Sequence, residues 1–176
     1  MKPLLIITFM FSLLYSSAPK QISYVDPKSF SGLWYEIART YNSFEENCVA
    51  ATVEYVLKKS NQYKVFNRCF ENQIGGNLIE YKGKAVALED NSMSRLKKTY
   101  YWIFSEEYKV IYLNDYKSAV IANDDMQYVW IMSRTPKMSN KEFKEIIALL
   151  DDYMNTKDLI ITPQDDKGRY KWKLQY

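Results

Sequence analysis

Short stretches in which hydrophobic and polar residues alternate follow one another along the middle of the chain. Alternation with a period of two is typical of β-strands, and polar or glycine-containing turns separate the stretches. The pattern predicts eight strands, over residues 34–40, 49–58, 63–70, 78–88, 95–104, 108–113, 118–122 and 126–133. Because no helical pattern interrupts them, we expect an all-β fold, an antiparallel up-and-down meander that closes as an eight-stranded barrel.

Helical periodicity appears only after the last predicted strand. Ser139 and Glu142 have the spacing of a capping box. Apolar residues then recur on one helical face, namely Phe143, Ile146, Ile147, Leu150 and Met154. We therefore expect one C-terminal α-helix that packs against the outside of the barrel, and residues 158–162 could add a short strand to its edge.

The N-terminal residues have the pattern of a secretory signal peptide. A lysine at position 2 is followed by an apolar run over residues 3–14 and by small residues at 16–18. The run is shorter than the ~20 residues of a membrane-spanning helix. We predict a signal peptide over residues 1–18, cleaved between 16 and 20, and a single domain over residues 19–176. The protein is then exported, to the periplasm of a Gram-negative bacterium or otherwise as a secreted protein.

Composition excludes several classes of function. The chain has no histidine, which removes the Ser-His and Cys-His nucleophile systems and most zinc sites. We assign no catalytic residue, metal or cofactor, and expect a protein that is not an enzyme. The net charge of +3 comes from interspersed charges of both signs, so nucleic acid is not expected as a partner. The 16 tyrosines combine an apolar ring with a polar tip, which suits the wall of a ligand cavity.

The two cysteines, Cys48 and Cys69, lie near the open end of the second and third predicted strands. An even number of cysteines in an exported chain favours one disulfide, with two free buried thiols as the alternative. Regular alternation does not place both side chains on one face. A bridge therefore requires that Cys48 lies off the strand or that a β-bulge intervenes.

Three motifs resemble those of the lipocalin family: Gly32-x-Trp34-Tyr-Glu-Ile-Ala-Arg39, Asn114-Asp115-Tyr116 and Trp130-Ile-Met-Ser-Arg134-Thr-Pro136. With the signal peptide, eight strands and single helix, the chain is most similar to bacterial outer-membrane lipocalins and apolipoprotein D. The resemblance implies a barrel whose cup holds one small hydrophobic or amphipathic molecule. It also implies that Gly32, Trp34 and Arg134 are structural, because Trp34 closes the barrel floor and Arg134 packs across it. Bacterial members often carry a lipid anchor, but no cysteine near residue 18 could accept one, so we expect at most peripheral membrane association without an anchor.

The inner face follows from alternation, with Trp34 and Arg134 as phase markers. Phe44, in the polar connection after the first strand, is expected at the mouth as a candidate gate. The predicted lining is Val53, Tyr55, Val65, Asn67, Ala85, Lys98, Tyr100, Trp102, Val110, Tyr112, Tyr128, Trp130 and Met132. Lys98 has two interpretations: a cation for a fatty-acid carboxylate or phospholipid phosphate, or a solvated lysine at the rim.

An aromatic wall with several hydroxyl groups favours a ligand with an apolar chain and a polar end. The main hypothesis is an exported protein, monomeric or weakly dimeric, that carries or scavenges a fatty acid, lysophospholipid or phospholipid in membrane maintenance or lipid transport. One alternative is that the open-end loops bind a protein or another small ligand. A less favoured alternative is an isomerase-type enzyme, for which Glu36 is the sole plausible acid among the inward residues.

Overall fold

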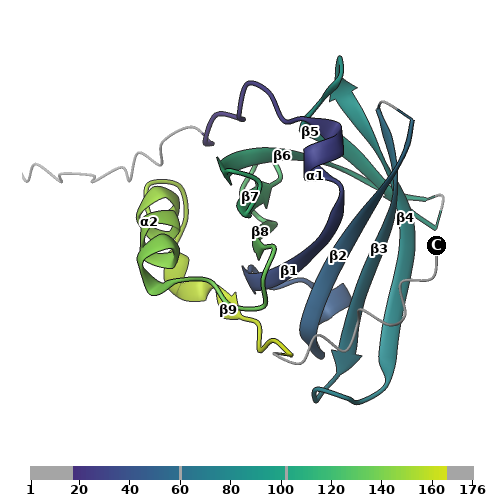
Figure 1. The fold of residues 1–176 in the computed structure, drawn as a ribbon. Helices are drawn as coiled ribbons and strands as arrows, with labels where there is room; N and C mark the ends of the chain where they lie inside the picture. The colour runs from purple at the N-terminus through teal and green to yellow at the C-terminus, as the bar shows by residue number, and fades with distance from the viewer. Residues whose placement is uncertain (1–17, 60, 102, 166–176) are drawn as a thin grey trace, which may run out of the picture.

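Eight antiparallel strands form a closed barrel in the computed structural model, which describes residues 18–59, 61–101 and 103–165. The strands are β1 (Gly32–Arg39), β2 (Cys48–Lys59), β3 (Gln62–Glu71), β4 (Leu78–Glu89), β5 (Ser92–Tyr100), β6 (Phe104–Asn114), β7 (Ser118–Ala122) and β8 (Val129–Ser133). Each strand pairs with the next in the chain, and β1 pairs with both β2 and β8, which closes the barrel (Figure 1). The predicted fold class is confirmed.

The main helix, α2 (Asn140–Leu150), lies outside the barrel as predicted (Figure 1). The hydroxyl of Ser139 accepts a hydrogen bond from the backbone N–H of Glu142 at 3.2 Å, which caps its first turn. Ile146 and Leu150 are fully buried in a cluster with residues of β7 and β8. After a 3₁₀ turn, η2 (Thr156–Asp158), the short β9 (Ile160–Ile161) pairs with β1, as the sequence indicated. Among the described residues, no helix is long and apolar enough to cross a membrane.

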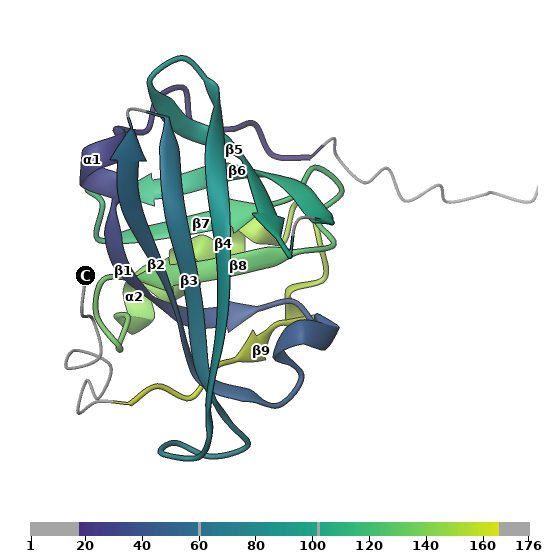
Figure 2. The ribbon, with the colours of Figure 1, turned by 90° about the vertical axis from the view of Figure 1, so that its right-hand side faces the viewer.

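A single helical turn that the sequence analysis did not predict, α1 (Pro27–Phe30), covers one end of the barrel (Figure 2). Asp26 accepts a hydrogen bond from the backbone N–H of Ser29 at 2.7 Å and Pro27 begins the turn, both typical of a helix start. Phe30 packs on Trp34 with 5.0 Å between ring centroids. This end is therefore closed by aromatic packing.

Arg134 fastens α1 to the barrel floor. Its guanidinium carbon lies 3.8 Å from the Trp34 ring centroid, the stacking that the resemblance implied. The guanidinium donates hydrogen bonds at 2.8 Å to the backbone carbonyls of Ser29, Ser31 and Leu33. Gly32 has φ of +96°, which favours glycine, and a Cβ there would lie 3.3 Å from Nη1 of Arg134. The closed end thus has its polar groups hydrogen-bonded as well as its rings packed.

The cysteines form a disulfide, with 5.4 Å between the Cα atoms of Cys48 and Cys69. The β2–β3 register shifts between Val49 and Thr52, and Ala50 adopts a positive φ of 51°. Of the two arrangements that the sequence left open, the bulge is the one observed.

The boundary between β5 and β6 differs from the prediction. The predicted strand over residues 95–104 ends too late, because Tyr100 pairs with Phe104 across a tight hairpin and Tyr101 has φ of 48°. Glu106 and Glu107, which fall between the predicted strands over residues 95–104 and 108–113, lie within β6. The run from Thr99 to Phe104 contains no glycine, proline, asparagine or aspartate, so composition gave no turn signal.

Candidate functional site

A cavity of about 390 Å³ occupies the barrel and opens at the end opposite α1. Figure 2 shows that the turn between β5 and β6 and the 3₁₀ turn η1 (Ser43–Glu45) lie at this open end. Most of the lining is aromatic or aliphatic, and a few polar groups converge on it. Such a cavity suits one small ligand with a long apolar part.

The structure brings eight of the predicted lining residues together on the cavity wall: Phe44, Val53, Asn67, Lys98, Tyr100, Tyr128, Trp130 and Met132. Four others point inward but lie deeper, in the core between the cavity and α1: Tyr55, Val65, Ala85 and Val110. Trp102 lies outside the described residues.

The inward assignment of Tyr112 is wrong. A bulge shifts the β6–β7 register between Val110 and Tyr112, and the phase of the strand changes with it. Ile111 and Tyr112 both pack in the outer cluster beneath α2, whereas Leu113 packs against the inner core.

Several wall residues were missed, among them Tyr108, Phe104 and Glu106. They alternate along β6, so the same reasoning would have found them if the predicted strand had begun at Phe104. Tyr81 on β4 was missed as well, and so was Ile121 on β7.

Lys98 lies in the cavity wall among aromatic rings. Its Nζ is 4.8 Å from the ring centroid of Tyr108, 5.4 Å from that of Trp130 and 5.5 Å from that of Tyr55. In the part of the chain that the structure describes, no carboxylate lies within ion-pairing distance of Nζ. Burial lowers the pKa of the ammonium group, partly opposed by Tyr100 and Glu45. The side chain is buried, so the interpretation as a solvated rim lysine is wrong.

Two hydroxyl groups lie near this cation. Tyr100 accepts a hydrogen bond from Nδ2 of Asn67 at 2.5 Å. The Tyr55 hydroxyl is fully buried and has no hydrogen-bond partner among the described residues. A buried polar group without a partner is costly, so this hydroxyl lowers the stability of the core below the cavity, where Tyr55 packs against Phe30 and Tyr63.

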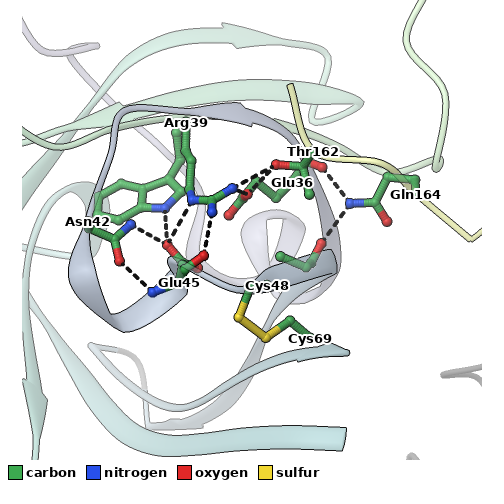
Figure 3. A network of polar contacts seen from close by, with 10 residues as sticks. Glu36, Arg39, Asn42, Glu45, Cys48, Cys69, Thr162 and Gln164 are labelled. Carbon is green, nitrogen blue, oxygen red and sulfur yellow. Dashed lines mark hydrogen bonds and ion pairs between the residues drawn. A yellow bond between two sulfur atoms is a disulfide. The ribbon is translucent and has the colours of Figure 1, made fainter. Parts of the chain in front are cut away.

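A polar network forms one side of the site, and its members Glu36, Asn42 and Glu45 lie on the cavity wall (Figure 3). Arg39 pairs with Glu36 at 3.1 Å and donates a second hydrogen bond to Oγ1 of Thr162 at 3.2 Å. It also donates to the backbone carbonyl of Glu45 in η1. Nε1 of Trp130 donates to Oε2 of Glu45 at 3.1 Å. The network therefore connects the β1–β2 connection at the mouth with an aromatic residue of the wall.

Glu36 and Glu45 share the single guanidinium of Arg39. The pKa of Glu36 is raised from 4.5 to about 8, first by burial and then by the neighbouring Glu45, while the guanidinium of Arg39 acts to lower it. A hydrogen bond between the two carboxyl groups contributes in the same direction as burial. Where two carboxyl groups face one cation, the more deeply buried one is favoured to keep its proton, and that group is Glu36, because Glu45 is partly exposed.

Comparison with known proteins gives a consistent match. The family model described as a lipocalin-like domain matches residues 25–164. The outer membrane lipoprotein Blc of Citrobacter freundii is 33% identical, over 74% of this chain and 76% of its own length. Apolipoprotein D of Macaca fascicularis is 24% identical, over 86% of this chain and 82% of its own.

Solved structures support the same fold at lower identity. Insecticyanin from the tobacco hornworm Manduca sexta superposes with a TM-score of 0.65 at 15% identity, covering 87% of this chain and 89% of that one. Lobster apocrustacyanin A1 gives a TM-score of 0.63 at 18% identity, covering 89% and 95%.

Proposed function

Because the chain belongs to the lipocalin family, we propose that it is an exported carrier or scavenger of a small amphipathic lipid with an anionic end. The apolar part of the lipid lies in the aromatic cavity, and its carboxylate or phosphate lies beside Lys98. Fatty acids, lysophospholipids and phospholipids all have this chemistry.

The observation that carries this proposal is the environment of Lys98. A buried ammonium group without a counterion is unfavourable in a low-dielectric cavity, and a ligand anion would relieve that cost. The surrounding rings of Tyr108 and Trp130 present apolar surface to an acyl chain, and such burial stabilises a complex by ~25 cal/mol per Å². The combination favours an amphipathic anion over a pure hydrocarbon.

The side chains that could act in catalysis, two cysteines and one buried carboxyl group, are already engaged with other residues, which favours binding without catalysis. Cys48 and Cys69 are joined to each other, so neither is a nucleophile. The carboxyl group of Glu36 is held by Arg39 and Thr162. Export is supported by the predicted signal peptide over residues 1–18 and by bacterial relatives that are named outer membrane lipoproteins.

Native mass spectrometry of the purified protein, followed by organic extraction, tests the ligand class directly. One fatty acid or lysophospholipid per chain is the expected result. A protein that is isolated empty, and whose tryptophan fluorescence does not change on titration with either lipid, would contradict the proposal.

The role of Lys98 is tested with 11-(dansylamino)undecanoic acid and its methyl ester as fluorescent probes. Lys98→Met removes the cation while keeping an apolar chain, and we expect it to weaken binding of the acid about 10- to 100-fold, the value of one charge-assisted hydrogen bond. Binding of the ester should change little. Lys97→Met is the matched control, since Lys97 is exposed on the adjacent position of β5. Equal losses for acid and ester would show that the variant damages packing rather than anion recognition.

A further inference from the structure

Large hydrophobic side chains are exposed around the mouth of the cavity. Tyr101, Ile103 and Phe104 belong to the β5–β6 hairpin, Phe44 belongs to η1, and more than half of each side chain is accessible to solvent. Ile103 reaches 79% exposure. The rings of Phe44 and Phe104 meet edge to face with 6.0 Å between centroids, so the two segments form one surface. We call these four residues the rim patch.

The rim patch is continuous with the interior of the barrel. All four of its side chains also line the cavity. A lipid that leaves the cavity would therefore pass over apolar surface until it reached whatever covers the patch. Exposed apolar clusters of this kind mark interaction sites in soluble proteins.

We propose that the rim patch docks on the surface of a lipid bilayer, so that cargo passes between bilayer and cavity without crossing water. This inference rests on the proposed function, because it takes the cargo to be a lipid. Aromatic side chains partition well into the headgroup region of a bilayer, where Tyr101 can keep its hydroxyl hydrated while Phe44, Ile103 and Phe104 enter the acyl boundary.

The charges beside the rim patch indicate which kind of bilayer is expected. The exposed carboxylates nearest to it in sequence are Glu46, beside η1, and Glu106, on β6. Lys98, the lysine closest to the hairpin tip in sequence, is buried within the barrel. Docking should then depend on the burial of apolar side chains. The affinity for the bilayer should increase little when anionic lipid is added and decrease little at high salt.

The test is co-sedimentation of the full mature chain with phosphatidylcholine vesicles. The double variant Ile103→Ser/Phe104→Ser should weaken vesicle binding about 10- to 100-fold, as expected when two large apolar side chains no longer enter the interface. The matched control is Tyr24→Ser/Leu88→Ser, which removes two exposed apolar side chains near the closed end and should bind vesicles like the natural chain.

Three outcomes would contradict the proposal that the rim patch docks on a bilayer. One is a natural chain that takes up the dansyl fatty acid from water but does not bind vesicles, which leaves the proposed function intact. Another is binding that requires phosphatidylglycerol and disappears in high salt. The third is a concentration-dependent dimer that the rim variant abolishes, with no vesicle binding, which would assign the rim patch to a second copy. Conversely, vesicle binding by a chain that takes up no fatty acid would overturn the proposed function and leave the docking surface standing.

Discussion

Replacing Glu36 with glutamine should make the protein more stable, relative to the natural chain, as the pH rises. The carboxyl group of Glu36 is buried between Arg39, Thr162 and the carboxyl of Glu45, and its pKa is raised from 4.5 to about 8. Between these two values the folded chain holds a proton that the unfolded chain has released. Folding stability therefore falls as the pH rises through this window, and the part due to Glu36 is greatest below pH 4.5.

The magnitude follows from the two pKa values. A change from 4.5 to about 8 corresponds to about 4–5 kcal/mol across the full window. Glutamine has the shape of the protonated carboxyl group, since its amide can donate to Glu45 while its oxygen accepts from Thr162. At pH 5 the Glu36→Gln variant should thus be within about 1 kcal/mol of the natural chain. By pH 8 it should exceed the natural chain by several kcal/mol.

Urea unfolding at a series of pH values between 5 and 9, with the disulfide intact, measures this difference. Glu46→Gln, an exposed change in the same connection, corrects for the loss of one carboxylate from the chain. A difference that stays flat with pH would refute the reasoning. A difference of opposite sign would show that Glu36 is ionised and bound to Arg39 as a simple ion pair.

Two further predictions concern the elements that hold the barrel together. Arg134→Lys keeps the charge but loses the planar stack on Trp34 and most of the hydrogen bonds to backbone carbonyls. Urea unfolding should therefore show that the free energy of unfolding falls by about 2–4 kcal/mol. A decrease below about 1 kcal/mol would show that water replaces these contacts. Removing the disulfide with Cys48→Ser/Cys69→Ser opens a loop of 21 residues and should cost about 3 kcal/mol. Reduction of the disulfide in the natural chain should lower the free energy of unfolding by the same amount in the same assay. A much smaller decrease would show that loop-closure entropy is not what the disulfide contributes to stability.

Much of the fold was predictable because alternation and capping are local properties. The strand pattern and the Ser139 cap depend on residues within a few positions of one another, and both were confirmed. The side-chain phase was less predictable. Bulges in β1, β2 and β6 each insert one residue and so exchange the inward and outward positions of the strand. The positions of the two cysteines offered the β2 bulge as one of two alternatives, but no local signal marked the bulges in β1 and β6. Tyr112 was misplaced for this reason.

The chemical character of the site could not be read from any single strand. Lys98 comes from β5, while the rings around it come from β2, β6 and β8. Alternation predicted that Lys98 points inward, but its lack of a counterion is a property of the closed barrel. The same holds for the shared guanidinium of Arg39, which joins β1 to η1 and to Thr162 beyond β9.

The cations at the two ends of the barrel are held in different ways, and this contrast separates a structural cation, Arg134, from a candidate ligand-binding one, Lys98. Both cations lie against aromatic rings, but the guanidinium of Arg134 donates to backbone carbonyls, whereas Nζ of Lys98 has neither a hydrogen-bond acceptor nor a counterion within the described residues. An unpaired buried charge lowers stability, and a fold retains it when binding requires it. Lys98→Met should therefore unfold at a urea concentration equal to or above that of the ligand-free natural chain, although it binds the dansyl acid less tightly. If the same variant were markedly less stable, the lysine would be part of the scaffold, and the anion site would have to be sought elsewhere in the cavity.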